Sequence, residues 1–126
     1  MIKLISRTVD NSVPIESYPA EAGDFERGDA LMLVGGKLCL ATTDKAIDFI
    51  SEETKSVATG EMLKVTRVVA DGTYESELVS DVDSINPGDV FAANDSCVGA
   101  QEGSGHLKVL FAEGKSAGSK VRFNII

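Results

Sequence analysis

The sequence has few of the residue types that build catalytic or metal centres. Among its 126 residues there is no Trp, one His, two Cys and three Pro. Any His-dependent chemistry therefore has a single candidate, His106. Cys39 and Cys97 are far apart and lack the spacing of metal ligands. A Cys97–His106 pair would also need an orienting acid and an oxyanion donor, and no motif supplies them. We therefore expect no catalytic residue, no cofactor and no metal.

Long apolar runs are missing as well. No stretch approaches the roughly 20 residues of a membrane-spanning helix, so we expect no membrane partner. The start of the chain has Lys3 and Arg7 inside its apolar stretch, which predicts that it is not a signal peptide. Without a secretory signal, two free thiols are a better expectation than a disulfide. The length suits one domain over residues 1–126.

Basic residues are absent from the middle of the chain. Residues 71–102 hold eight acids and no base, in a sequence of 20 acids, 12 bases and net charge −8. Residues 103–126 hold one acid against four bases, which are Lys108, Lys115, Lys120 and Arg122. An acidic chain repels a phosphate backbone, so we expect no nucleic-acid partner. The separated charges suit self-assembly, with an acidic face of one subunit against a basic face of the next. A solvated surface is the alternative.

A Gly-Gly turn predicts a first hairpin over residues 30–41. Two apolar runs flank Gly35-Gly36, and two-residue hairpin loops need the positive φ that Gly accepts. The register sets Leu33 opposite Leu38 and Leu31 opposite Leu40. Opposed residues share a face, so the four leucines are predicted to form one core face.

An Asp-Gly pair predicts a second hairpin over residues 62–79. The run to Ala70 meets Asp71-Gly72, a strong type I′ signal, and the return strand begins at Thr73. One face of this hairpin is mostly apolar, with Arg67 as the exception. We expect Arg67 to lie at a sheet edge or to pair with an acid across a subunit contact. The predicted interface residues are Arg67, Lys108, Lys120 and Arg122.

Further short strands are expected between turn signals. They are residues 2–6, 90–93, 97–99, 107–111 and 120–125. The only plausible helix covers residues 44–55, where 48–51 could equally be a strand. Many short strands with Gly-rich turns predict an all-β fold: a small antiparallel β-barrel or β-tulip-like domain with short hairpins and at most one short helix.

A four-residue pattern recurs along the chain. Gly, a small or acidic polar residue, any residue and an apolar residue follow one another from Gly28, Gly60, Gly88 and Gly118. Each Gly suits the positive-φ position of a turn, with a strand directly after it. The pattern predicts four strand starts, and either a true duplication or independent turns would produce it.

Two short motifs resemble binding sites and are better explained as turns. Arg27-Gly28-Asp29 spells an adhesion tripeptide, but it falls where the turn pattern needs Gly-Asp. Residues 81–86 begin like a calcium loop, yet Ile85 occupies a ligand place and Ala92 stands where the bidentate acid belongs. We expect a solvated acidic loop there.

The order of features along nearly the whole chain resembles the capsid decoration (cement or auxiliary head) proteins of tailed bacteriophages. The resemblance rests on Tyr18-Pro19-Ala20, Gly28 with Ala30-Leu31, Gly36-Lys37-Leu38 with Ala41, Asp48-Phe49-Ile50, Val65-Thr66-Arg67-Val68, Tyr74-Glu75, Asn86-Pro87-Gly88-Asp89 and the segment from Gly118 to Phe123. The chain departs from some relatives in ending with Asn124-Ile125-Ile126.

The resemblance implies a structural virion protein without catalytic residues. Such proteins sit on the outside of the capsid, after synthesis in the bacterial host cytoplasm, and are often trimers that bridge neighbouring capsid subunits. The implied partners are the major capsid protein and two further copies of the chain. Residues 1–27 form either an arm on a neighbour or a first strand and loop. The alternative function is a small bacterial β-barrel that binds a ligand or regulates another protein; an enzyme using Cys97, His106 or the acids at 71–89 is a third hypothesis.

Overall fold

The computed structural model describes residues 1–8 and 13–126, and its regular structure consists of β-strands. The strands are β1 (Lys3–Arg7), β2 (Ile15–Pro19), β3 (Gly23–Phe25), β4 (Ala30–Val34), β5 (Lys37–Leu40), β6 (Phe49–Ser51), β7 (Lys55–Val57), β8 (Met62–Arg67), β9 (Gly72–Glu77), β10 (Val90–Asn94), β11 (Cys97–Gln101), β12 (Leu107–Ala112) and β13 (Lys120–Ile125). The prediction of an all-β fold is confirmed. The helix considered for residues 44–55 is wrong, and the alternative strand at 48–51 agrees with β6 to within one residue, because Phe49 and Ile50 pair with β4.

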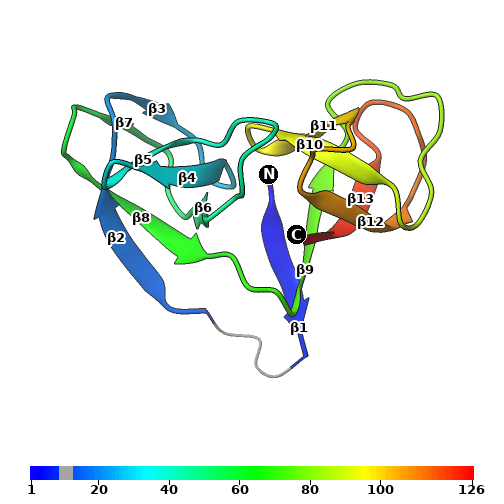
Figure 1. The fold of residues 1–126 in the computed structure, drawn as a ribbon, viewed down its shortest axis with the longest axis horizontal. Coiled ribbons are helices and arrows are strands. Elements are labelled where there is room, and N and C mark those ends of the chain that lie inside the picture. The colour runs from blue at the N-terminus through cyan, green and yellow to red at the C-terminus, as the bar shows by residue number, and fades with distance from the viewer. Residues whose placement is uncertain (9–12) are drawn as a thin grey trace.

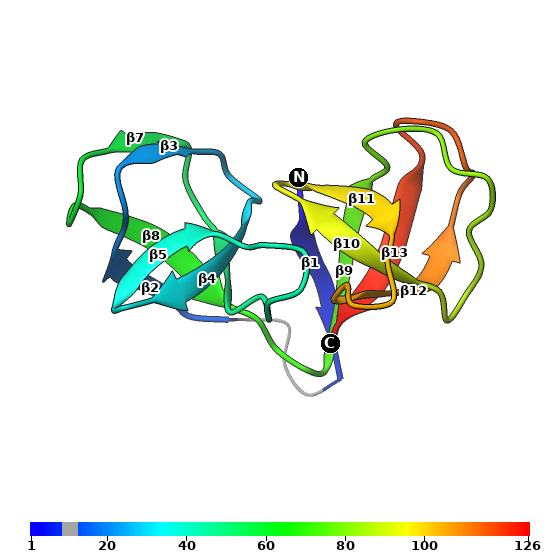
Figure 2. The ribbon, with the colours of Figure 1, turned by 45° about the horizontal axis from the view of Figure 1, so that its top comes forward.

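The strands pair into three sheets, which form two lobes (Figures 1 and 2). The C-terminal lobe is a six-stranded sheet with the order β1-β9-β13-β12-β10-β11. The N-terminal lobe has a five-stranded sheet, β2-β8-β6-β4-β5, and a two-stranded sheet, β3-β7. All ladders are antiparallel. The described strands thus form three separate sheets, and no closed barrel is assigned among them, so the expected β-barrel or β-tulip-like arrangement stays a prediction.

The two lobes repeat one backbone plan. The order β2-β8-β6-β4-β5 of the first lobe matches β9-β13-β12-β10-β11 of the second, with β1 added outside β9. An isolated parallel bridge links the first and last strands of each series, Ala20 to Leu38 and Leu78 to Val98. The four motif glycines, at φ of 87° to 93°, directly precede β4, β8, β10 and β13. The four predicted strand starts are therefore confirmed, and the pattern marks a twofold structural repeat with two motif glycines in each unit.

Each lobe has its own buried cluster on the inner face of its sheet. Leu31, Leu38, Phe49 and Leu63 lie with Phe25 and other residues in the N-terminal cluster. The C-terminal cluster is larger and includes Phe91, Val98, Leu107, Val109, Val121 and Phe123. We call the face that carries these residues the inner face of each sheet, and the opposite one the outer face. Strand residues alternate between the two.

The first predicted hairpin is correct in register and only half correct in burial. Leu31 pairs with Leu40 and Leu33 with Leu38 across the turn. Leu31 and Leu38 are fully buried, but Leu33 and Leu40 are 40% and 36% exposed. The four side chains share a face as predicted. Leu33 and Leu40 lie outside the buried cluster that contains Leu31 and Leu38, so the predicted four-leucine core face is wrong for Leu33 and Leu40.

The second predicted hairpin is wrong. Strand β8 pairs with β2 and β6 in the five-stranded sheet, whereas β9 pairs with β1 and β13 in the six-stranded sheet. Asp71-Gly72 is still a turn, closed by a bond from the Gly72 amide to the Val69 carbonyl, but neither residue has a positive φ. Period-two alternation identified both strands correctly and carried no information about their partners. The turn instead carries the chain from one lobe to the other (Figure 1).

The lobes contact each other through unlike faces. On β4 and β6, Leu31 and Phe49 point to the inner face, so their neighbours Ala30 and Ile50 lie on the outer face. Ala30 and Ile50 are both buried, and they belong to the cluster of the C-terminal lobe. The amide of Ala30 also donates to the carbonyl of Asp95 at the tip of the β10–β11 hairpin (3.0 Å). The outer face of the first lobe therefore covers one end of the inner face of the second.

Residues 1–27 contribute strands to both lobes. Strand β1 pairs with β9 and places Ile2, which is 1% exposed, in the C-terminal cluster. Strand β2 pairs with β8. Gly28, at φ 92°, accepts the Ile2 amide on its carbonyl and leaves no room for a side chain beside Met1. The role of this segment as an arm on a neighbouring protein stays a prediction.

Candidate assembly surfaces

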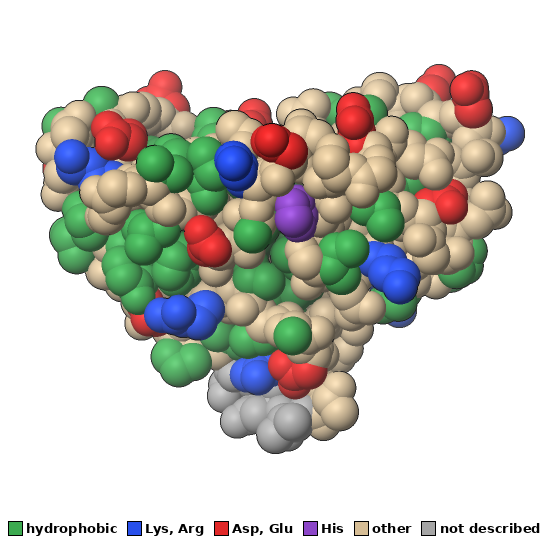
Figure 3. Space-filling model, viewed as in Figure 1, with side chains coloured by type: hydrophobic (Ala, Val, Ile, Leu, Met, Phe, Trp, Pro, Cys, Tyr) green, Lys and Arg blue, Asp and Glu red, His purple; other side chains and the backbone are tan. Residues whose placement is uncertain are grey.

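An uncovered end of the five-stranded sheet is the first candidate surface. It lies on the inner face, next to the exposed Leu33, and forms a shallow groove lined by Leu33, Ile47, Asp48, Phe49, Arg67 and Val68. We call this surface the open end and include in it Glu16 and Tyr18, which adjoin Arg67 and Phe49. Figure 3 shows hydrophobic side chains gathered over this lobe, among acidic and basic ones.

A polar network lies over Phe49 at the open end. The Arg67 guanidinium lies 5.4 Å from the centre of the Phe49 ring, and the centres of the Tyr18 and Phe49 rings are 4.8 Å apart. Arg67 Nη2 donates to Glu16 Oε1 (3.0 Å) and to the Tyr18 hydroxyl (3.1 Å), and that hydroxyl donates to Glu16 Oε1 (2.8 Å). These bonds hold a cation over an aromatic face at a distance where it is attracted by the ring.

The network shifts the titration of its members. Hydrogen bonds from Arg67 and then from Tyr18 lower the pKa of Glu16. Donation to Glu16 raises the pKa of Tyr18. Arg67 was predicted at a sheet edge or paired with an acid of another subunit. The structure pairs it with Glu16 of the same chain, so a partner across a subunit contact is not needed to explain its place.

Asp48 adds an acid to the open end. Its side chain accepts the Leu33 amide on Oδ2 (3.0 Å), and its residue is exposed. Among the residues that the structure describes, no Lys or Arg lies within ion-pair distance of Asp48. The open end thus combines apolar side chains with one acid that has no cationic partner.

The outer face of the six-stranded sheet is the second candidate surface. Leu107, Val109, Val121 and Phe123 are buried on its inner face, so the residues between them, Lys108, Lys120 and Arg122, point outward and are exposed. Lys108 lies opposite Asn124, two residues along the strand from Arg122. The structure therefore brings three of the four predicted interface residues to one face and leaves Arg67 on the other lobe.

The acidic middle and the basic end of the sequence meet within this sheet. Arg122 Nε lies 3.2 Å from Glu75 Oε2, Lys3 contacts the other oxygen of Glu75 at 3.8 Å, and the terminal amine pairs with Glu77 at 3.0 Å. Strand pairing across β9 and β13 thus accounts for part of the charge separation inside one chain. Within the described residues, Lys108 and Lys120 have no carboxylate at ion-pair distance.

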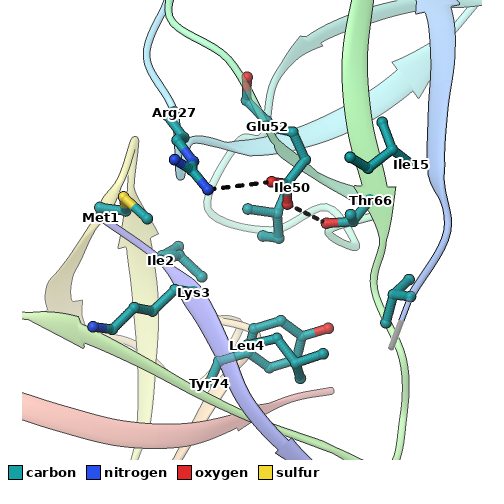
Figure 4. Close-up of a pocket in the computed structure, with 12 residues that line it drawn as sticks. Met1, Ile2, Lys3, Leu4, Ile15, Arg27, Ile50, Glu52, Thr66 and Tyr74 are labelled. Atoms are coloured by element: carbon teal, nitrogen blue, oxygen red, sulfur yellow. Dashed lines mark hydrogen bonds and ion pairs between the residues drawn. The ribbon is translucent and has the colours of Figure 1, made fainter. Parts of the chain in front are cut away.

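A third surface is a cleft of about 290 Å³ between β1 and the outer face of the five-stranded sheet (Figure 4). Met1, Ile2 and Leu4 come from one side, with Tyr74 beneath, and Ile15, Ile50 and Thr66 come from the other. Glu52 accepts the Thr66 hydroxyl (2.9 Å) and lies 3.9 Å from Arg27. The cleft has the mixed polar and apolar lining that a small ligand needs, at the small end of the size range of ligand sites.

The other motifs are structural. Asp29 of the Arg-Gly-Asp sequence is 3% exposed and accepts the Glu26 amide, so its carboxylate faces inward. Burial raises the pKa of Asp29. Asp81 accepts the amide of Ala117, which lies in the loop between β12 and β13. Cys39 and Cys97 are both free and half-buried, as expected.

His106 is also placed by backbone contacts. Its Nδ1 lies 2.7 Å from the carbonyl oxygen of Ile126, and the Ile126 amide donates to the His106 carbonyl. Among the described residues there is no group of three His, Cys, Asp or Glu side chains arranged to hold a metal. The same residues contain no helix of the length and hydropathy needed to span a membrane.

Comparison with protein-family models finds no match, and comparison with curated proteins finds none either. The candidate surfaces are therefore described from this chain alone. Glu16, Tyr18 and Asp48 were not predicted from the sequence. Alternation of Ile15, Glu16, Ser17 and Tyr18 was the available signal, because it places the acid and the aromatic ring on one face.

Proposed function

We propose that this chain is a structural protein that decorates the outside of a tailed-phage capsid and stabilises it by bridging capsid subunits. In this proposal it acts as a homotrimer on the virion surface, has no catalytic role, and binds the major capsid protein. The family resemblance of the sequence suggests this function, and the surface of the two lobes supports it.

The observation that carries the proposal is the amount of apolar surface left on the strands. Large hydrophobic side chains are at least half exposed on both lobes: Ile15 (64%), Phe111 (57%), Val34 (55%) and Met62 (50%). Single exposed apolar residues are common, but clusters of them beside charged groups are typical of protein contacts. At the open end Leu33 (40%) lies beside the exposed Arg67, with the buried Phe49 ring under the guanidinium, and on β12 Leu110 (43%) adjoins Phe111.

The test is binding to capsid shells. We expect a major capsid protein to be encoded in a neighbouring reading frame. That protein is assembled into shells, mixed with the purified chain and sedimented, with naked DNA as the parallel partner. We expect saturable binding to shells, none to DNA, and a higher melting temperature of decorated shells. A chain that stays in the supernatant at micromolar concentration refutes the proposal.

A ligand-binding module is the second candidate, and the cleft between β1 and the outer face of the five-stranded sheet favours it. Native mass spectrometry of the chain purified from bacterial cytoplasm distinguishes the two. A small molecule retained by the wild type and lost in Thr66→Leu would support the ligand-binding function.

A further inference from the structure

The two lobes are equivalent in backbone but not in what covers them. Equivalent positions lie 58 to 60 residues apart, as Ala20 and Leu78 do in the two bridges and Gly28 and Gly88 in the two turns. The pairs of β4 with β6 and of β10 with β12 match in register. Leu31 faces Phe49 where Phe91 faces Leu107, and Ala30 faces Ile50 where Val90 faces Lys108.

The C-terminal lobe has the end of its inner face covered by the N-terminal lobe. Ala30, Ile47 and Ile50 from the first lobe, with Ile2 just before β1, are buried in the same cluster as Tyr74 and Ile125. Tyr74 and Ile125 both lie at that end, because Ile125 pairs with Leu107 at the end of β13. The contact is apolar on both sides.

In the N-terminal lobe the equivalent end is the open end. By the spacing of the repeat, Glu16 stands where the second lobe has Tyr74, Arg67 where it has Ile125, and Leu33 where it has Ala93. Ala93 is half-buried against the C-terminal cluster, whereas Leu33 is 40% exposed. The end of the inner face is therefore covered in the second lobe and uncovered in the first, where Glu16 and Arg67 stand in place of Tyr74 and Ile125.

The outer face of the first lobe, which covers the second lobe, also has an equivalent surface on the second lobe. Ala30 and Ile50 on the outer face of the first lobe correspond to Val90 and Lys108 on the outer face of the second. Lys108 is exposed and has no ion-pair partner among the described residues. Lys108 thus stands where the first surface has Ile50, and Glu16 and Arg67 stand where the second lobe has Tyr74 and Ile125, so the acids of the open end, and not Arg67, are complementary to Lys108.

We infer that the open end of one chain binds the outer face of the C-terminal lobe of a second copy, around Val90 and Lys108. The contact repeats between chains the packing that joins the two lobes within a chain. Lys108 faces the acids of the open end, where Glu16 is already paired with Arg67 and Asp48 has no cation at ion-pair distance among residues 1–8 and 13–126. Leu33 packs beside the lysine stem, which has apolar surface to bury. This inference rests on the proposed function only in naming the homotrimer as the product.

A contact of this kind is heterologous, because it joins two different surfaces of the same chain. Repetition closes into a ring if the rotation between copies allows it, and otherwise produces a filament. Three chains in a ring would present six lobes in head-to-tail order. Every open end and every Lys108 would then be covered.

Charge exchange at residues 48 and 108 tests the contact. The molar mass of the wild type, Asp48→Lys, Lys108→Glu and the double variant is measured by light scattering after gel filtration, at low salt. We expect each single variant to associate at least tenfold more weakly than the wild type, because like charges then oppose each other at every contact. The double variant restores an opposite pair and should recover the wild-type mass.

Controls separate the contact from general charge effects and from misfolding. Asp44→Lys and Lys45→Glu change the same charges in the exposed loop nearby and should leave the mass unchanged. Circular dichroism of each variant verifies the fold, since Asp48 also accepts the Leu33 amide. Lys108→Glu removes no such hydrogen bond, so the molar mass of this variant tests the contact independently.

The outcomes distinguish this inference from the proposed function. Recovery in the double variant supports the contact; a mass near that of three chains agrees with the homotrimer, and larger species indicate a filament. Single variants that associate like the wild type overturn the contact while leaving capsid binding intact. A wild type that is monomeric at all concentrations overturns it as well, and shell sedimentation then judges the proposed function separately.

Discussion

Leu31 and Leu33 offer a sharp test of the packing at the N-terminal lobe. They lie two residues apart on β4 and point to the same face, but Leu31 is fully buried and Leu33 is 40% exposed. Leu31→Ala removes buried methyl groups and leaves a cavity, so the free energy of unfolding should fall by about 2–5 kcal/mol. Leu33→Ala removes only part of the roughly 1.5–3 kcal/mol that full burial of a leucine contributes, and it leaves no closed cavity. Its cost should be about 1 kcal/mol.

The measurement is urea unfolding of both variants and the wild type, followed by circular dichroism at several protein concentrations. Concentration matters because self-association stabilises the folded chain and would add to the cost of losing Leu33. At the lowest concentration the two costs should differ by at least 1 kcal/mol. Equal costs there would refute the assignment of Leu33 to the uncovered end of the sheet and restore the four-leucine core that the sequence alone suggested.

Other predictions concern glycine, tyrosine, aspartate and the charged contacts. Gly28→Ala should destabilise the fold more than Gly36→Ala. Both glycines have a positive φ, which costs an L-residue roughly 1–2 kcal/mol, but only at Gly28 does the added Cβ also meet Met1 and the backbone of Ile2. Thermal melts of the two variants side by side check this. Tyr74→Phe leaves the Val69 amide without its acceptor and should cost about 1–3 kcal/mol in urea unfolding. Burial raises the pKa of Asp29 above its ordinary 3.8, so the folded state holds this proton more tightly. The stability of the wild type relative to Asp29→Asn should therefore be highest below pH 3.8 and fall as the pH rises through the folded-state pKa; a flat difference between pH 3 and 7 would contradict this. Salt should weaken association while the melting of the dissociated chain stays unchanged, as light scattering and calorimetry can establish together.

Local signals in the sequence predicted the elements well. Gly35-Gly36 fixed the register of the first hairpin, because the turn sets which residues oppose each other. The glycine pattern marked four strand starts. Strand β13 matches its predicted range, and β12 extends one residue beyond it.

Long-range pairing was not predictable in the same way. Asp71-Gly72 looked like a hairpin turn because alternation reports a strand's buried face and not its neighbour. Which end of the leucine face is covered depends on β3 and β7, and no local pattern expresses that. Arg67 was recognised as unusual, yet its partner Glu16 lies 51 residues earlier. The open end depends on these long-range contacts, so no local pattern in the sequence predicted it.

The pairing of β1 with β9 has a consequence for how the chain reaches its fold. Lys3 lies opposite Glu75, and the whole N-terminal lobe lies between them in sequence. Closing so long a loop costs more entropy than closing any hairpin, and non-local pairs of this kind slow folding. The N-terminal lobe, built from a continuous stretch of chain, can form before that loop closes. The C-terminal lobe can bury Ile2 only once that loop has closed.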